Sequence, residues 1–400
     1  MSVSVCSSLA IDGGTPVRST VLPYGHQSID QTDVRHVAEA LLSDRVTTGP
    51  RVCQFEAAFA EAVGARYGVA VSSGTAALHA AVFAAGIGPG DEVVTTPMTF
   101  AATANAVRFQ NGSVAFADVQ PDTLNIDPSQ IRAKISRHAK AIIAVDFAGQ
   151  PADIDEILAV ATDYRLCVIE DAAHALGSTY KGRKVGALAT MTTFSLHPVK
   201  QITTGEGGMI TTNDPELARR LRRFRNHGIS ADHDEREARD SWYYEISELG
   251  YNYRLTDIQS ALGLSQLEKH GRWLVRRREI AREYSHAFGD MPELELPHER
   301  HDRQSAWHLY VVKLKLDRLS VGRGQIFRAL RAENIGVNVH YIPVPWHPYY
   351  QKLGYTRGQW PVAEAAYERL ISLPIWPGMS HQDVSDVIQA VQKVVHAYRR

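Results

Sequence analysis

Short apolar runs alternate with segments of helical spacing along the first two thirds of the chain. Apolar runs of strand length occupy residues 68–71, 92–95, 114–117, 141–145, 166–169 and 209–212. Apolar residues recur at helical spacing over residues 31–42, 54–63, 76–85 and 101–108. Runs without polar alternation are typical of strands that are buried on both faces. The pattern therefore predicts an α/β domain whose mostly parallel sheet is covered by helices on both faces.

The last third of the chain has a different pattern, which predicts a smaller α+β domain. Its expected elements are a long helix over 255–286, a half-buried strand over 308–316, a helix over 324–333, a strand over 337–341 and a closing helix over 383–398. Residues 229–247 are polar and without periodicity, so we expect an exposed excursion there. We predict three parts: an N-terminal arm (1–30), the α/β domain (31–267) and the α+β domain (268–400).

Composition and charge exclude several classes of partner. The 400 residues include 43 Lys and Arg against 44 Asp and Glu, a formal net charge of −1, which provides no field that would attract nucleic acid or an anionic membrane. No run of ~18 apolar residues occurs, and residues 1–10 lack the basic flank of a secretory signal. We therefore expect a cytoplasmic protein without nucleic-acid or membrane partners. Cys6, Cys53 and Cys167 are odd in number and widely spaced, which favours packing roles for reduced thiols.

Lys200 and Asp171 carry the chemistry that the sequence indicates most strongly. Lys200 is followed by the glycine-rich segment 203–208, and Asp171 follows the apolar run 166–169. A lysine forms a Schiff base only as the neutral amine, and the aldehyde pyridoxal phosphate is the commonest partner of such a lysine. Asp171 would lie at the carboxyl end of a strand, where ligands bind in open α/β sheets, and would hold the pyridine nitrogen protonated. These residues predict a pyridoxal phosphate site.

Simpler interpretations exist for both residues. Lys200 could be a surface lysine, and Asp171 could be a helix cap or one half of a surface ion pair. The glycines at 205, 207 and 208 favour the functional interpretation, because they let the backbone pass close to a ligand.

A phosphate site is predicted where residues 72–77 connect a strand to a helix. The backbone N–H groups and the positive end of that helix could hold a phosphate, and Gly74 would allow its close approach. Ser195 could add a hydroxyl to the same phosphate. The segment could also be an ordinary capped helix. Neither a G-x-x-x-x-G-K loop nor a G-x-G-x-x-G pattern occurs, which disfavours nucleoside triphosphates and dinucleotides.

Two further signals are better explained without a function. Five arginines between residues 219 and 225 suggest a nucleic-acid stripe, but they follow a helix start at Asp214 and Pro215, and a solvated helix face explains them in a neutral chain. His233 lies among acidic residues, yet no spacing there matches a metal-ligand motif. We therefore predict no metal site.

Five motifs occur in the order found in a known family, from near residue 20 to the end of the chain. They occupy residues 73–78, 96–100, 170–174, 194–200 and 250–259. The chain resembles the DegT family of pyridoxal phosphate-dependent nucleotide-sugar aminotransferases. The resemblance implies an aspartate aminotransferase-like (fold-type I) structure and a homodimer with active sites shared between subunits. Within the family, segments 195–200 and 260–267 most resemble the transaminases of pseudaminic acid synthesis, although Leu196 stands where an aromatic residue is common.

The matching motifs imply roles for individual residues. Lys200 would be the Schiff-base residue and Asp171 the partner of the pyridine nitrogen. The other cofactor contacts would be Phe100 stacked on the ring, His174 beside the phenolic oxygen, Gly74, Thr75 and Ser195 at the phosphate, and Asn252 at the cofactor of the partner subunit. Substrate contacts in similar enzymes fall on segments matching Tyr24, Asp44, Arg45, Val46, Thr47, His340, Tyr341, Ile342 and Pro343.

The resemblance also implies a reaction, in which an amino group moves from L-glutamate to C4 of a UDP-linked 4-keto-6-deoxy-N-acetylhexosamine for surface polysaccharide synthesis. Other possible acceptors are GDP-4-keto-6-deoxymannose and UDP- or dTDP-linked 3-keto sugars. Some relatives carry histidine in place of the lysine and dehydrate their substrates, so Lys200 favours amination. A different hypothesis is a cofactor-binding regulator that uses the arginines and the excursion as interaction surfaces, but no helix-turn-helix segment supports it.

Overall fold

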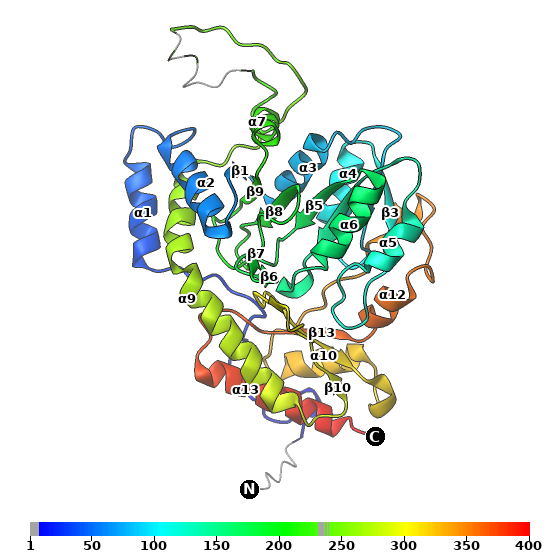
Figure 1. The fold of residues 1–400 in the computed structure, drawn as a ribbon. Coiled ribbons are helices and arrows are strands. Elements are labelled where there is room, and N and C mark those ends of the chain that lie inside the picture. Colours follow the sequence, from blue (N-terminus) through cyan, green and yellow to red (C-terminus); the bar gives the residue numbers. More distant parts are fainter. Residues whose placement is uncertain (1–7, 231–235, 237, 239) are drawn as a thin grey trace.

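A seven-stranded sheet forms the centre of the larger part of the molecule (Figure 1). The computed structural model describes residues 8–230, 236, 238 and 240–400. Along the sheet, the strands are β1 (Tyr67–Val71), β9 (Gly208–Thr212), β8 (Met191–Ser195), β5 (Cys167–Asp171), β4 (Ala139–Val145), β2 (Glu92–Thr95) and β3 (Ser113–Phe116). Strand β9 is antiparallel to both of its neighbours, and the other neighbouring pairs are parallel. The prediction of a mostly parallel sheet is confirmed.

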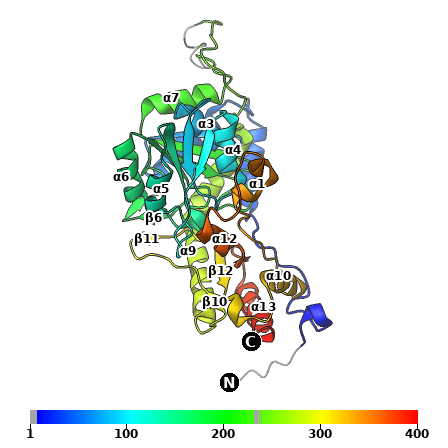
Figure 2. The ribbon, with the colours of Figure 1, turned by 90° about the vertical axis from the view of Figure 1, so that its right-hand side faces the viewer.

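Helices cover both faces of this sheet (Figure 2). One face packs against α3 (Gly74–Ala84), α4 (Ala101–Phe109) and α7 (Pro215–Phe224). The opposite face packs against α2 (Pro50–Val63), α5 (Pro128–Lys134), α6 (Ile154–Tyr164) and the first half of α9 (Asp257–Phe288). Because both faces are covered, the central strand β4 is buried at each of its last five positions, as its apolar run predicted.

A second core lies beside the sheet domain and draws most of its residues from the last hundred of the chain. Its antiparallel sheet has the order β10 (Leu294–Glu295), β12 (Tyr310–Leu314) and β13 (Leu370–Leu373). The second half of α9, α10 (Arg323–Ala332) and α13 (His381–Ala397) pack on it. The remaining helices are α1 (Gln31–Leu41), α11 (Pro348–Gln351), α12 (Pro361–Tyr367) and the 3-10 turns η1 (Ala10–Asp12), η2 (Phe147–Gly149), η3 (Leu316–Arg318) and η4 (Val344–Trp346). A small sheet joins β6 (Thr179–Tyr180), β7 (Arg183–Lys184) and β11 (Arg303–Gln304).

Two predictions for this second part are wrong in detail. Strand β12 is buried at every position, not half-buried, because it lies between the two cores. Residues 337–341 do not form a strand: Asn338 makes an isolated bridge with Ser372, and the chain then turns into η4.

One prediction for the cysteines is also wrong. Cys53 is exposed on α2, so it does not have the packing role expected for it. Cys6 lies outside the described residues.

The N-terminal arm lies against the C-terminal part of the chain. Leu22 forms a parallel bridge with Ile335, and Arg18 forms ion pairs with Asp383 and Asp386. Helix α9 runs without a break through residue 267, which is the predicted limit between the two domains. The predicted domain limits 1–30, 31–267 and 268–400 therefore stay predictions. Because α9 is continuous, it contributes side chains to both cores.

The arginines of α7 are paired with acidic side chains. Asp214 caps the helix, as predicted, by accepting hydrogen bonds from the backbone N–H groups of Glu216 and Leu217. Arg222 and Arg225 form ion pairs with the buried Glu56, and Arg220 and Arg223 form ion pairs with Glu248. These arginines tie α7 to its neighbours, which leaves little free charge for a nucleic acid.

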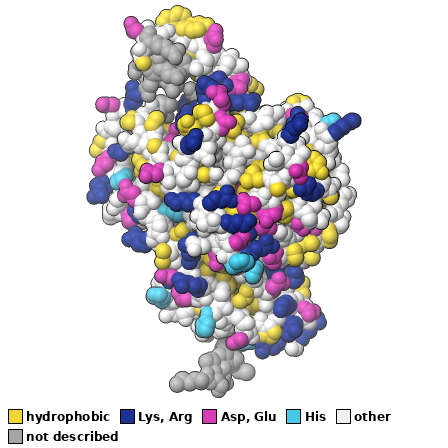
Figure 3. Space-filling view, viewed as in Figure 1, with side chains coloured by type: hydrophobic (Ala, Val, Ile, Leu, Met, Phe, Trp, Pro, Cys, Tyr) yellow, Lys and Arg dark blue, Asp and Glu magenta, His cyan; other side chains and the backbone are white. Residues whose placement is uncertain are grey.

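The predicted excursion projects from the sheet domain beyond α7 (Figure 1). Its base is closed by an antiparallel bridge between Ile229 and Ile246, and much of 232–237, including His233, lies outside the described residues. Its described part exposes large apolar side chains, such as Trp242 at 85%, and Figure 3 shows hydrophobic groups at the tip. In the described ranges, no helix is both long and apolar enough to cross a membrane.

Candidate active site

A cavity of about 510 Å³ lies at the carboxyl ends of the parallel strands β4, β5 and β8. Val145, Asp171 and Ser195 end these three strands and line the cavity. Parallel strands present their carboxyl ends at one edge of a sheet, which is where open α/β sheets bind ligands. The structure brings together ten of the predicted site residues on this lining: Tyr24, Gly74, Thr75, Phe100, Asp171, His174, Ser195, Lys200, His340 and Tyr341.

The first turn of α3 forms one wall of the cavity. Ser73 is the N-cap, and its side chain accepts a hydrogen bond from the N–H of Ala76. The N–H groups of Gly74 and Thr75 lie in the first turn, where a helix offers its backbone donors no partner of its own. A Cβ at Gly74 would lie 2.8 Å from Cβ of Ser195, so only glycine allows β8 to approach this helix end. This wall suits an anion such as a phosphate.

Asp171 lies on the floor of the cavity and is 4% exposed. Its Oδ2 accepts a hydrogen bond of 2.8 Å from the hydroxyl of Thr103, and its Oδ1 accepts one of 3.3 Å from the N–H of Ala173. Burial raises the pKa of Asp171, while these bonds and the charge of Lys200 act in the opposite direction. The carboxyl is therefore held in one orientation in a site that favours pairing with a cation.

Lys200 extends into the same cavity from the loop after β8. Burial lowers the pKa of its amine to about 8, and the charge of Asp171 partly opposes this change. The free amine is therefore much more available at neutral pH than that of a surface lysine. That is the property that covalent chemistry with an aldehyde requires.

Aromatic and imidazole rings form the remaining walls. His174 Nε2 lies 3.1 Å from the hydroxyl of Tyr341, and His340 Nδ1 lies 2.8 Å from Oγ of Ser372. Burial lowers the pKa of His174 well below its ordinary value and that of His340 to about 4, so both rings are neutral at pH 7. Phe100 caps the start of α4 and is 61% exposed, which leaves its ring free to cover a flat ligand.

The remaining predicted residues lie outside the cavity lining. Asp44, Arg45, Val46 and Thr47 are exposed and are held at the start of α9, where Val46 O accepts from Asp257 N and Thr47 bridges Thr256. Asn252 is exposed five residues before Asp257. Ile342 is exposed and Pro343 is buried beyond the rim formed by Tyr341. Within a single copy of the chain, these residues therefore do not line the cavity that contains Lys200 and Asp171.

The lining also contains residues that sequence analysis did not propose for the site, among them Thr103, Glu206 and His308. The signal that could have found Thr103 is its spacing of four residues from Thr99 at the expected start of the helix over 101–108; in the structure the hydroxyls of the two residues lie 2.8 Å from each other. His308 comes from just before β12 in the second core. No local signal in the sequence places it beside the sheet domain.

Comparison with known proteins decides the family. The family model described as the DegT/DnrJ/EryC1/StrS aminotransferase family matches residues 27–392. The chain belongs to this family. The predicted family, fold-type I architecture, pyridoxal phosphate and transaminase class are thereby confirmed.

Relatives within the DegT/DnrJ/EryC1/StrS family cover nearly the whole chain. The spore coat polysaccharide biosynthesis protein SpsC of Bacillus subtilis (strain 168) is 46% identical over 381 residues, which are 94% of this chain and 98% of SpsC. Helicobacter pylori PseC, an aminotransferase involved in the biosynthesis of pseudoaminic acid, is 32% identical with a TM-score of 0.88, covering 95% of this chain and 100% of PseC. The PLP-form of Spr1654 from Streptococcus pneumoniae is 30% identical with a TM-score of 0.88, covering 94% and 99%. This DegT-family member is a sugar aminotransferase related to PseC and SpsC.

The cavity of this DegT-family enzyme fits pyridoxal phosphate. Gly74 lets Ser195 of β8 approach the free donors at the start of α3, and this combination of N–H groups and a hydroxyl suits the phosphate. Nδ1 of His174 is buried and has no hydrogen-bond partner among the described residues, so it is available to a polar atom of a ligand. Asp171 and Lys200 interact electrostatically on the same floor, which suits a cationic ring nitrogen and an aldehyde.

Gly74→Ala tests the phosphate wall. The added Cβ would contact Ser195 at 2.8 Å, and overpacking of this kind costs about 1–3 kcal/mol. We expect the affinity for pyridoxal phosphate to fall by roughly 10- to 100-fold in an absorbance titration of the cofactor-free protein. Gly271→Ala on α9 is the matched control, because a Cβ there meets nothing within 4 Å. Unchanged affinity in Gly74→Ala would place the phosphate elsewhere.

The rate at which cofactor-free protein takes up pyridoxal phosphate should depend on pH through Lys200. Only the neutral amine reacts, and with a pKa of about 8 its fraction rises from ~10% at pH 7 to ~90% at pH 9. The rate, followed by the growth of the visible absorption band, should therefore rise about ninefold over this range and then level off. A rate that continued to rise about tenfold per pH step above pH 9 would indicate an ordinary lysine pKa.

Proposed function

We propose that this enzyme transfers the amino group of L-glutamate to C4 of a UDP-linked 4-keto-6-deoxy-N-acetylhexosamine. The observation that carries the proposal is the joint placement of Lys200 and Asp171 on the floor of one cavity, in a chain related over nearly its full length to PseC and SpsC. The product would be an amino sugar nucleotide used for surface polysaccharide, with pseudaminic acid synthesis as the nearest parallel. The cytoplasmic location expected from the sequence is part of this proposal.

Lys200 and Asp171 would perform the central steps. Bound pyridoxal phosphate supplies an aldehyde that carries the amino group and a ring that accepts electrons. The Nζ of Lys200 would hold the cofactor at rest and, once displaced by the amino donor, would move the proton of the reacting carbon as a general base and acid. Asp171 would keep the ring nitrogen protonated, and Thr103 would keep Asp171 aligned through its 2.8 Å hydrogen bond.

The other residues of the lining would orient the cofactor. Gly74, Thr75 and Ser195 would bind its phosphate at the start of α3, and Phe100 would cover one face of its ring. His174 would contact the phenolic oxygen. None of these side chains is charged at neutral pH, so they would fix position without competing for the proton on Lys200.

We further propose that two copies of the chain share each active site. Among the described residues that line the cavity there is no arginine, although L-glutamate and a sugar diphosphate both carry negative charge. Arg45 and Asn252 lie outside the lining and are exposed, in two segments joined near the start of α9. A homodimer would bring Asn252 of one protomer to the cofactor of its partner and would place residues 44–47 at the sugar nucleotide.

Within one protomer, the proposed substrate contacts lie on the cavity wall formed by Tyr24, His340 and Tyr341. The rings of Tyr24 and His340 lie 5.4 Å apart, and Tyr341 follows on the same wall. Ile342 and Pro343 continue this segment toward the surface and would contact the substrate only at the rim. Aromatic rings and neutral polar groups of this kind suit a sugar ring.

The test is a transamination assay on the purified protein with pyridoxal phosphate. Without an acceptor, L-glutamate should yield at most about one 2-oxoglutarate per cofactor-loaded site. Repeated turnover should require an acceptor, with the UDP-linked 4-keto-6-deoxy-N-acetylhexosamine as the best one. GDP-4-keto-6-deoxymannose and UDP- or dTDP-linked 3-keto sugars are compared in the same assay, and a higher kcat/KM for any of them would replace the proposed substrate. No turnover with the whole panel would overturn the proposal.

The alternative of a cofactor-binding regulator makes a different prediction. It requires no turnover together with a salt-dependent shift of DNA in a gel. The ion pairs of the α7 arginines with Glu56 and Glu248 disfavour it, because those side chains are already engaged within the protein.

A further inference from the structure

His308 lines the cavity and stacks on His174, although no part of the proposed reaction uses it. The ring centroids of the two histidines lie 4.3 Å apart at an angle of 31°, and each residue is 5% exposed. Nδ1 of both rings is buried and has no hydrogen-bond partner in the described part of the chain. Two imidazoles, each with an unpaired Nδ1 atom, therefore pack against each other in the cavity that Lys200 also lines.

The backbone around His308 is fitted closely to the segment that carries His174. Gly149 has a φ of +104°, and a Cβ there would lie 2.9 Å from His174 O and 3.0 Å from His308 N. The N–H of Ala306 donates to Gly149 O at 3.0 Å, and the N–H of Leu309 donates to Ala148 O at 3.2 Å. These contacts fix the distance between the two rings through the backbone on both sides of His308.

Arg277 of α9 holds the same turn from behind. It is 1% exposed, and its Nη1 donates to the carbonyls of Trp307 (3.1 Å), His308 (3.4 Å) and Ile375 (3.0 Å). No carboxylate within the described ranges forms an ion pair with it. Burying a cation without an acidic partner costs free energy, and the hydrogen bonds to these backbone carbonyls offset part of that cost.

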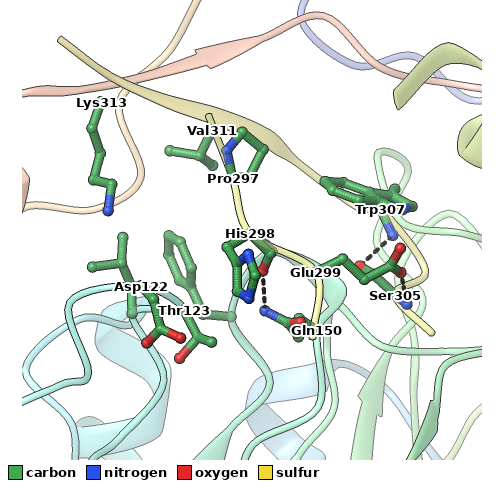
Figure 4. Close-up of a pocket in the computed structure, with 13 residues that line it drawn as sticks. Asp122, Thr123, Gln150, Pro297, His298, Glu299, Ser305, Trp307, Val311 and Lys313 are labelled. Atoms are coloured by element: carbon green, nitrogen blue, oxygen red, sulfur yellow. Dashed lines mark hydrogen bonds between the residues drawn. The ribbon is translucent and has the colours of Figure 1, made fainter. Parts of the chain in front are cut away.

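Trp307 completes the turn on its other side. Its φ of +47° is a left-handed conformation that non-glycine residues rarely adopt. Trp307 lines a small cavity of about 40 Å³ (Figure 4). Its backbone N–H donates a hydrogen bond of 3.0 Å to Ser305 Oγ, and the backbone N–H of Ser305 donates one of 2.6 Å to Glu299 Oε1. Hydrogen bonds thus hold the turn both from this side and from Arg277.

We propose that His308 is a positioning residue that keeps the ring of His174 neutral and fixed in orientation, and that Arg277 holds His308 in place through its backbone. The consequence for catalysis rests on the proposed function, in which His174 contacts the cofactor. The stacking itself does not depend on that function.

The electrostatics of the neighbouring groups agree with this role. Burial lowers the pKa of His308 well below its ordinary value, and His174, Lys200, Arg277 and His340 add to the effect. For His174, burial is again the largest cause, followed by Lys200 and His340. His308 covers one face of His174 and so excludes water that would otherwise stabilise a charged ring.

A neutral His174 has a specific benefit in this site. Tyr341 has a pKa that burial raises above its ordinary value, so its hydroxyl keeps its proton and is able to donate to His174 Nε2. In that arrangement the proton of His174 is on Nδ1, where it can serve a ligand oxygen as a donor. Among Lys200, His174, His308, His340 and Tyr341, Lys200 then has the pKa nearest to neutral, about 8.

The test is an NMR titration of the full-length protein labelled at histidine Cε1, with His174→Gln used to assign the His174 signal among the 17 histidines. In the wild type we expect the His174 signal to be constant through the range around pH 6.5 in which free imidazole titrates. In His308→Ala, water reaches the ring, so the pKa of His174 should rise toward that of free imidazole and its signal should change within this range. His308→Phe keeps the stacked volume and should restore the constant signal.

Controls separate positioning from a general loss of structure. His270→Gln removes a half-buried histidine of α9, whose pKa desolvation lowers to about 4, and should leave the His174 signal unchanged. His308→Asn replaces the alanine variant if that variant does not fold. A constant His174 signal in the smaller variants, or a titrating signal in the wild type, would overturn the proposal.

A second measurement links the proposal to the cofactor. With pyridoxal phosphate bound, the visible band should show an additional pH-dependent change in His308→Ala within the range in which His174 titrates, and no such change in the wild type or in His308→Phe, because a cation beside the phenolic oxygen favours its deprotonated form. Absence of any visible band in the wild type would contradict the proposed function but leave the NMR result standing. A normal band with the same pH dependence in all variants would contradict the role of His308 instead.

Discussion

Replacing Lys200 by alanine is expected to reduce turnover by at least about 10⁴-fold. Under the proposed mechanism, the variant loses both the amine that would bind the cofactor covalently and the general base that would move the proton, and general acid–base catalysis alone contributes ~10²–10⁴-fold. A lowered pKa, about 8, makes this amine suited to both tasks. The rate is measured as 2-oxoglutarate formed from L-glutamate with the best acceptor sugar.

Two controls make the Lys200→Ala result specific. Lys352→Ala removes an exposed lysine at the end of α11 and should retain full activity. Added methylamine should partly restore turnover to Lys200→Ala, because a small amine can occupy the vacated space and move the proton. Full activity of Lys200→Ala without added amine would remove the basis of the mechanism.

Replacing Asp171 by asparagine is expected to lower kcat by about 10²–10³-fold. Removing one partner of a buried ion pair costs ~3–5 kcal/mol, and an amide cannot hold the ring nitrogen as a cation. Thr103 Oγ1 still has an oxygen to donate to in the variant, so the fold around α4 and β5 should persist. Activity is measured together with the visible spectrum, which should show that the cofactor is still bound.

Glu170→Gln is the matched control for Asp171→Asn. Glu170 precedes Asp171 in β5, is fully buried and does not line the cavity. Burial raises its pKa to about 7, so a neutral amide resembles one of the forms that it already adopts. We expect kcat to change little in this variant. Equal losses in both variants would indicate that the strand, and not the carboxylate at the cavity, is the cause.

The sequence predicted the cavity floor because its residues follow local rules. β4 and β5 are continuous apolar runs, which is the pattern of parallel strands covered on both faces. Asp171 ends such a run, and ligands bind at that edge of a sheet. Gly74 was recognisable because a strand feeds a helix there, and the structure shows that a side chain at this position would contact Ser195.

Other parts of the site depend on tertiary contacts that no local pattern reports. His308 reaches the cavity because Arg277 and Gly149 fix a turn that starts in the second core. The expected strand over 337–341 fails because its residues pair with β13 only at Asn338, and His340 turns to Ser372 instead. The proposal that two copies share each site was implied by the family resemblance, and the placement of Asn252 and residues 44–47 outside the cavity lining supports it.

Chemical trapping tests the central claim, the covalent bond between Lys200 and the cofactor, most directly. The purified enzyme with pyridoxal phosphate is reduced with borohydride, digested and analysed by peptide mass spectrometry. We predict that the reduced cofactor is found on the peptide containing Lys200 and on no other lysine peptide. A modified lysine elsewhere, or no modified peptide from an active preparation, would contradict the account.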